Sequence, residues 1–93
     1  MFVLHVAVKV KDGEKEMLEN AFLGSFKAAI SAQEGFKAAT LLRPDGAGDY
    51  SLSIAFENQA LQQKWVATDL HQKVWPMMEK HIAQFAVQTF TAV

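Results

Sequence analysis

The sequence contains no cysteine, and this absence removes several classes of function at once. Without thiols the chain forms no disulfide bond, offers no thiolate nucleophile and cannot hold zinc or an iron–sulfur cluster through cysteine. The apolar start, Met1 to Val8, runs into Lys9 without a basic leader or a cleavage signature, so no signal peptide is predicted. Both observations favour a cytoplasmic protein.

The chain also lacks an excess of charge of either sign, with nine Lys and Arg against ten Asp and Glu. A nucleic-acid-binding domain needs a basic patch, and no cluster of lysine or arginine is present, so we expect no nucleic-acid partner. Long hydrophobic runs are missing too. Because a membrane-spanning helix needs about 20 apolar residues, we expect no membrane partner.

Proline and glycine are scarce, two and five among 93 residues, and only residues 43–49 form a turn-rich patch. With no linker, repeat or low-complexity segment, the sequence predicts one domain spanning residues 1–93. What the chain does have is apolar material, since 51% of its residues are hydrophobic. A domain of this size buries only about 60–65% of its unfolded surface. Self-association is the simplest way to bury the apolar surface that remains exposed.

The spacing of apolar residues predicts the elements. Alternation predicts strands, and apolar steps of three and four predict helices. Asn58 is a candidate N-cap, and Asp69 with Gln72 three residues on has the spacing of a capping box. The expected strands are Phe2–Lys11, Phe36–Arg43, Tyr50–Phe56 and Ala83–Thr91, and the expected helices are Glu14–Glu34, one after Asn58, and one from Asp69 to His81.

This order predicts an α+β, ferredoxin-like βαββαβ fold with a four-stranded antiparallel sheet and helices on one face. The second helical region is split in two near Thr68. Gly24 should mark a close approach or a local break in the first helix, and Gly35 should end that helix as a C′ glycine. The opposite sheet face would be bare, and a second copy is its expected cover, giving a homodimer.

Candidate chemistry is concentrated between Ile54 and His81, where both tryptophans and two of the three histidines lie. His71 and Trp75 are four residues apart on one helical face, so the imidazole could border a pocket with an aromatic wall. The alternative is a boundary histidine that serves structure alone. His5, in an otherwise apolar strand, is more typical of a structural residue, although the polar residues Ser51, Ser53, Gln84 and Gln88 could lie on its face.

Metal and phosphate sites find no support. His5, His71 and His81 have no short ligand spacing, so no metal site is expected. The glycines of residues 45–49 belong to a hairpin loop flanked by carboxylates, which would repel a phosphate.

Several short segments together carry a family resemblance. Val8 to Gly13 is similar to a strand-to-helix opening, Glu34-Gly35-Phe36 with Leu41-Leu42-Arg43 is similar to a second strand, and Phe56 to Leu61 is similar to a third signature. In these the whole chain resembles the antibiotic biosynthesis monooxygenase family of the dimeric α/β-barrel superfamily. The resemblance implies a homodimer that oxygenates quinol- or polyphenol-like substrates without flavin, haem or metal.

The resemblance extends to His71, which matches the second histidine of a family pattern, whereas Trp65 stands at the first histidine. Haem-degrading relatives also have a tryptophan at the position of Trp65. Where those relatives have a histidine this chain has Trp75, and where they have an asparagine it has Val6. Haem degradation is therefore not expected.

Two functions remain from this reading. The first is a cofactor-independent monooxygenase acting on a small aromatic, quinol-like molecule, with His71 as the catalytic base. Trp65, Trp75 and Tyr50 would be the aromatic walls of its substrate site and His5 a polar partner. The second is a non-catalytic dimeric module that binds a small molecule or serves structure in the same fold.

Overall fold

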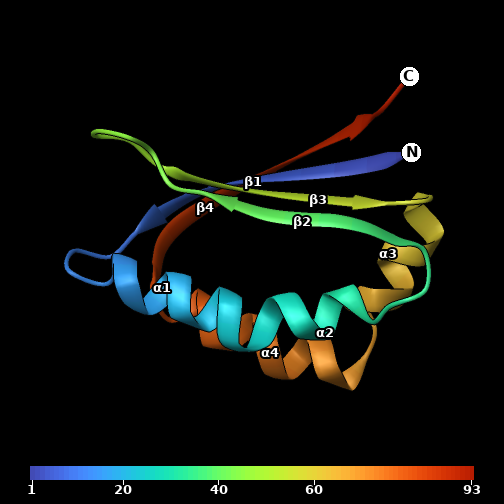
Figure 1. Cartoon of the computed structure of the whole chain (residues 1–93), viewed down its shortest axis with the longest axis horizontal. Helices are drawn as coiled ribbons and strands as arrows, with labels where there is room; N and C mark the ends of the chain where they lie inside the picture. Colours follow the sequence, from blue (N-terminus) through green and yellow to red (C-terminus); the bar gives the residue numbers. More distant parts are fainter.

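A computed structural model describes residues 1–93 as a four-stranded sheet with every helix on one face (Figure 1). The elements follow in the order β1 (Phe2–Val10), α1 (Lys15–Ala21), η1 (Phe22–Phe26), α2 (Lys27–Ser31), β2 (Phe36–Leu42), β3 (Tyr50–Phe56), α3 (Gln59–Val66), α4 (Asp69–Glu79) and β4 (Ile82–Thr91). The strand order is β2-β3-β1-β4, and all three pairings are antiparallel. The predicted ferredoxin-like fold is confirmed.

The alternation of β1 decides which sheet face the helices cover. Val6 and Val8 are 4% and 0% exposed, and the residues between them point away from the helices. Because partners in an antiparallel ladder share a face, Leu52 and Tyr50 of β3, opposite Val6 and Val8, are buried too. Trp65, Met78 and Ile30 complete the core from the helical side.

The first helical region differs from the single helix predicted over Glu14–Glu34. It contains a π-helical turn, η1, between α1 and α2, and it ends at Ser31. A methyl group on Gly24 would meet nothing within 4 Å, so this glycine marks the local break and not a close approach. Past the end of the helix, the side-chain amide of Gln33 donates to the carbonyl of Ala29 (3.1 Å) and so satisfies one of the free carbonyls of the last turn.

Gly35 serves a different purpose from the C′ glycine that the sequence predicts. It lies in the turn after the helix, with φ of 78°, and leads directly into β2. A Cβ at this position would collide with the Cδ1 atom of Leu61 on α3. The backbone of the turn at Gly35 therefore packs directly against the side chain of Leu61 on α3.

The starts of α3 and α4 test the two predicted caps. Asn58 caps α3 as expected, its side-chain oxygen accepting the N–H of Leu61 (3.0 Å). The capping box at Asp69 is wrong, because Asp69 is already helical and Thr68 is the N-cap, accepting the N–H of His71 (3.1 Å). This shift by one residue frees the side chain of Gln72 for other contacts.

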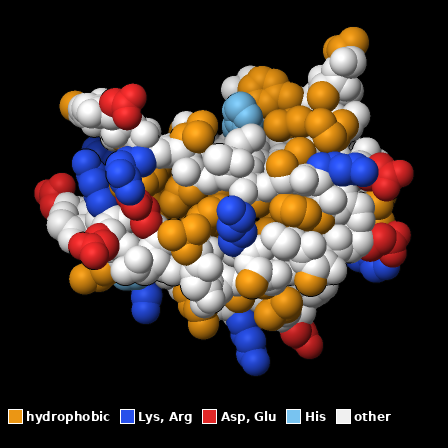
Figure 2. All heavy atoms as spheres, in the orientation of Figure 1, with side chains coloured by type: hydrophobic (Ala, Val, Ile, Leu, Met, Phe, Trp, Pro, Cys, Tyr) orange, Lys and Arg blue, Asp and Glu red, His pale blue; other side chains and the backbone are white.

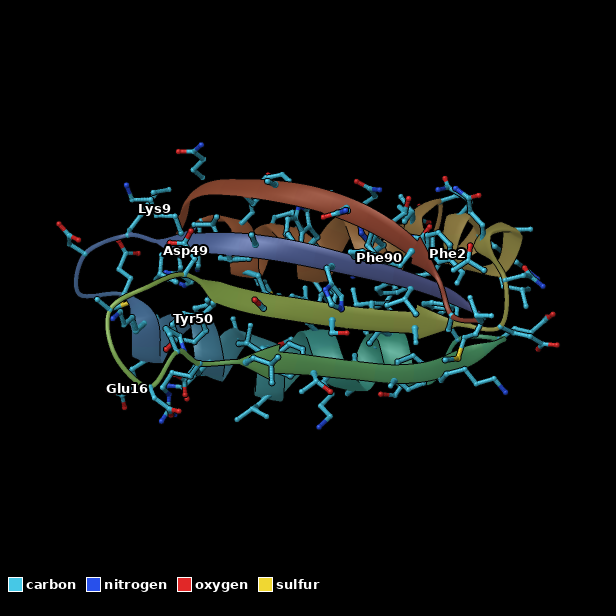
Figure 3. All side chains as sticks on the ribbon, turned by 90° about the horizontal axis from the view of Figure 1, so that it is seen from above. Phe2, Lys9, Glu16, Asp49, Tyr50 and Phe90 are labelled. Carbon is cyan, nitrogen blue, oxygen red and sulfur yellow. The ribbon has the colours of Figure 1, made fainter.

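The second face of the sheet, called the open face below, is not covered by any element (Figure 3). Figure 2 shows hydrophobic side chains gathered over the end of the sheet that carries the two termini. The register places small, polar and apolar residues together on the open face: Val3, His5, Ala7, Thr40, Leu42, Ser51, Ser53, Ala86, Gln88 and Phe90. None of the helices combines the length and hydrophobicity needed to span a bilayer.

Candidate functional site

A cavity of about 120 Å³ lies between the helix-facing side of the sheet and helices α3 and α4. Ten of its twelve lining residues are hydrophobic: Leu4, Val6, Phe26, Leu52, Ile54, Trp65, Val66, Trp75, Phe85 and Val87. The other two are Gln62 and His71. An apolar hollow with a few convergent polar groups is typical of a small-molecule site.

Aromatic rings hold the cavity in shape. The ring of Phe26, at the end of the π-helical turn, lies 6.0 Å from Trp65 and 6.3 Å from Trp75, edge to face in both cases. Trp75 in turn meets Phe85 of β4 at 5.6 Å. Trp65 is only 2% exposed, whereas Phe85 is 42% exposed, so the walls run from the core to the surface. The cavity therefore opens on the β4 side.

His71 is half-buried at the start of α4, and its ring stands edge to face against Trp65 at 5.1 Å. Burial lowers the pKa of His71 below its usual value of 6.5, because the protonated ring loses water and gains no carboxylate partner. The neutral imidazole is thus the prevailing form at neutral pH. Its Nδ1 atom lies 3.4 Å from the side-chain nitrogen of Gln72.

Three of the five residues predicted for the site meet here, namely Trp65, His71 and Trp75. His5 does not join them, because it is exposed on the open face, with its ring 5.0 Å from Phe90. Ser53 and Gln88 flank it in the register, so these polar residues do share its face. Within a single chain His5 is therefore not a polar partner of this cavity.

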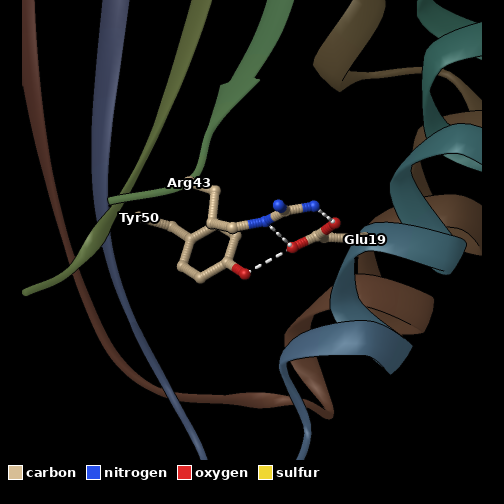
Figure 4. Close-up of polar contacts among 3 residues, drawn as sticks. All are labelled: Glu19, Arg43 and Tyr50. Carbon is tan, nitrogen blue, oxygen red and sulfur yellow. Dashed lines mark hydrogen bonds and ion pairs between the residues drawn. The ribbon is translucent and has the colours of Figure 1, made fainter. Parts of the chain in front are cut away.

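Tyr50 also lies elsewhere, in a separate hollow of about 190 Å³ between the first helical region and the ends of β2 and β3 that meet at the hairpin loop. Its hydroxyl donates to Glu19 at 2.5 Å, and Arg43 donates to both oxygens of the same carboxylate, at 2.7 and 2.6 Å (Figure 4). Hydrogen bonds from Arg43 and Tyr50 lower the pKa of Glu19 to about 2. Burial, followed by the bond to Glu19, raises the pKa of Tyr50.

Gln62 is the residue that sequence reasoning missed. It is 6% exposed and lies on the same face of α3 as Trp65 and Val66, three and four residues on. A glutamine at a core-facing helical position was the available signal. Phe85 and Val87 were missed as walls because β4 was expected to serve only as the closing strand.

No three His, Asp or Glu side chains converge as a metal-binding group. The third histidine, His81, is buried and bonded through Nδ1 to Glu14 at 2.8 Å, which ties the start of α1 to the end of α4. This contact gives His81 a structural role.

Residues 1–75 match the family described as antibiotic biosynthesis monooxygenase. The chain belongs to this family. No curated protein sequence matches it. Solved structures of the antibiotic biosynthesis monooxygenase fold superimpose closely, and at the identities below the likeness concerns the fold.

A candidate antibiotic biosynthesis monooxygenase from Caulobacter crescentus has a TM-score of 0.86 at 17% identity, over 99% of this chain and 89% of that one. SnoaB, a cofactor-independent oxygenase from Streptomyces nogalater, in mutant form, has a TM-score of 0.84 at 20% identity, over 98% and 91%. A mutant of MhuD with two manganese protoporphyrin IX molecules per active site has a TM-score of 0.77 at 22% identity, over 100% and 95%.

Proposed function

We propose that this member of the antibiotic biosynthesis monooxygenase family is a cofactor-independent monooxygenase that acts on a small aromatic hydroxy compound. The observation that supports this is the apolar cavity bordered by His71, Trp65 and Trp75. The tryptophans do not fill the hollow between them. It is therefore available to a ligand that His71 can reach.

The size of the cavity favours a compact substrate. An apolar protein cavity of about 150 Å³ holds one benzene molecule, so a hollow of about 120 Å³ accepts roughly one aromatic ring. A larger ligand would project through the opening beside Phe85, and a porphyrin far exceeds the enclosed space. Single-ring phenols with a hydrogen para to the hydroxyl are thus the first substrates to test.

The proposed reaction balances without a reductant. Converting a ring C–H para to a phenolic hydroxyl into a quinone carbonyl consumes one dioxygen and releases one water, with all four electrons supplied by the substrate. The ionised hydroxyl makes the ring electron-rich enough to reduce dioxygen, and the protein contributes orientation, exclusion of water and polar stabilisation. His71 is the residue proposed to engage the reacting oxygen.

An oxygen-electrode assay tests this function with a size series of resorcinol, a dihydroxynaphthalene with a hydrogen para to one hydroxyl, and anthrone. We expect consumption above the uncatalysed rate for the smallest substrate and a drop of about 100-fold in His71→Ala. Lys73→Ala, an exposed change two residues away, is the matched control. No consumption above blank, or a His71→Ala rate equal to wild type, would favour the non-catalytic binding module.

We also propose that the open face is the contact surface of a homodimer. It carries small residues, including Ala7 on the central strand β1 paired with Ala86 on the edge strand β4, and exposed Leu42 and Phe90 on the two edge strands. A flat face of this composition can lie against its own copy by two-fold symmetry. The partner would also cover His5.

Sedimentation velocity measures this association directly. Wild type should sediment as a dimer, and Ala86→Lys should shift it to monomer, because a lysine would be buried in the contact. Ala60→Lys, the same change on the exposed surface of α3, should leave the dimer intact. Monomeric wild type across a dilution series would reject the proposal.

A further inference from the structure

The two polar side chains of the cavity, Gln62 and His71, are each paired with a neighbouring glutamine amide. Gln63 donates from Nε2 to Oε1 of Gln62 at 3.1 Å. Gln72 places its Nε2 atom 3.4 Å from Nδ1 of His71. In both cases the neighbour occupies the acceptor atom of the group that borders the cavity.

The contact at His71 decides which of its nitrogens carries the hydrogen. Gln72 Nε2 also donates to the backbone carbonyl of Val66 at 3.0 Å, and a carbonyl accepts only, so this atom must be the amide nitrogen. Its second hydrogen can then be directed to Nδ1 of His71. A neutral imidazole that accepts at Nδ1 carries its own hydrogen on Nε2. Nε2 has no partner within the chain and is free to donate.

The contact at Gln62 has the same result. Its Oε1 atom is occupied by Gln63, and its Nε2 atom bonds to no protein group. No fully enclosed side-chain nitrogen or oxygen lacks a partner, so this nitrogen reaches open space although the residue is 6% exposed. The cavity is the hollow that Gln62 lines. An amide nitrogen there can donate but cannot accept.

We infer that the cavity is a donor-only site, which recognises a compact aromatic ligand through an acceptor oxygen, a phenolate or a quinone carbonyl, held by Gln62 Nε2 and His71 Nε2. Apolar walls raise the strength of such hydrogen bonds to an anionic oxygen. The inference names the ligand class and, for turnover, rests on the proposed function. It also changes the role of His71, which in this tautomer does not remove the proton but stabilises a phenolate that has already lost its proton to bulk water.

4-Nitrophenol is a suitable probe, because its phenolate is coloured and the ring cannot be oxygenated readily. Titration across the pH range of its ionisation should show the phenolate binding at least about tenfold more tightly than the neutral phenol. 4-Nitroanisole, which keeps the ring but cannot ionise, should bind about as weakly as the neutral phenol. Equal or tighter binding of the neutral phenol would overturn the inference.

Two substitutions test the glutamine pairings. Gln62→Leu should weaken phenolate binding about tenfold and leave the affinity for 4-nitroanisole unchanged. At a pH where the imidazole is neutral, Gln72→Glu presents an acceptor to Nδ1, moves the imidazole hydrogen there and should abolish the preference for phenolate over 4-nitroanisole. Gln59→Glu, the same change at the exposed start of α3, should have no effect.

Imidazole ¹⁵N chemical shifts report the tautomer of His71 independently of binding and turnover. Wild type should show hydrogen on Nε2, and Gln72→Glu should show it on Nδ1. Hydrogen on Nδ1 in wild type would reject the donor assignment even if oxygen is consumed. A phenolate preference without any oxygen consumption would instead reject the oxygenase and keep the donor-only site.

Discussion

The two hollows of this chain differ in what their polar groups are bonded to. Beside α1, Glu19 accepts from both Arg43 and Tyr50, so these three side chains satisfy one another, and the other polar residues of that hollow, Lys27 and Thr40, are exposed to water. Beside α3 and α4, Gln62 and His71 each keep a donor without a partner in the chain. A satisfied network needs nothing further, whereas unpaired donors among apolar walls favour a ligand. The hollow with the charged Glu19 and Arg43 is therefore interpreted as structural. The mostly apolar cavity with Gln62 and His71 is the candidate binding site.

The largest effect in this comparison is expected for Trp65→Ala. Trp65 is 2% exposed and forms part of both the core and the cavity wall, so its loss should reduce the free energy of unfolding by about 3–5 kcal/mol. Urea unfolding measures the change, and Trp65→Phe provides a milder version if the alanine variant does not fold. A loss below about 1 kcal/mol would show that the cavity is not anchored in the core.

A smaller effect is expected for Tyr50→Phe in the other hollow. Removing the hydroxyl leaves Glu19 with Arg43 alone and should cost about 1 kcal/mol in the free energy of unfolding. The affinity for 4-nitrophenolate should not change, because the ring lies outside the His71 cavity. A change of tenfold or more in that affinity would mean that the two hollows are coupled.

Gly24→Ala probes the π-helical turn that joins the hollows, since Phe22 borders one and Phe26 the other. An added methyl meets nothing within 4 Å, so we expect a gain of about 0.5 kcal/mol from helix propensity. Thermal unfolding measures it. A loss of stability would show that the π-helical turn itself requires glycine.

The smallest effect is a dependence of stability on pH. The folded pKa of His71 lies below its unfolded value of 6.5, so its contribution is complete above that pH and is lost as pH falls through the folded pKa. Glu19, lowered from 4.5 to about 2, loses its contribution only between those values. Unfolding free energies of wild type and His71→Asn should therefore diverge first below pH 6.5. Parallel curves down to pH 5 would contradict the burial of His71.

The strands were predictable to within about a residue, because alternation of apolar side chains is a strong local signal. It also placed Tyr50 on the helix-facing side correctly. Alternation identifies a face but not a position along the strand, and Tyr50, opposite Val8, lies too far from the cavity. Gly24 did predict the break at η1, whereas its π-helical form and the choice of Thr68 over Asp69 as N-cap were not evident from residue spacing.

Trp75 and His71 of the candidate site were predicted to share a helical face because they are four residues apart. Gln62 was not recognised because a single glutamine on a helix is usually solvent-exposed, and only packing of α3 against the sheet buries it. The pairings of Gln62 with Gln63 and of His71 with Gln72 depend on rotamers, which no pattern of residue types specifies.

The contact between Gly35 and Leu61 extends the reach of the candidate site into a turn that touches no ligand. Any side chain at position 35 must displace Leu61, and Leu61 is the backbone neighbour of Gln62. A variant there is therefore expected to strain the first turn of α3, which carries Gln62, and to lower ligand binding in a functional screen while every lining residue remains intact.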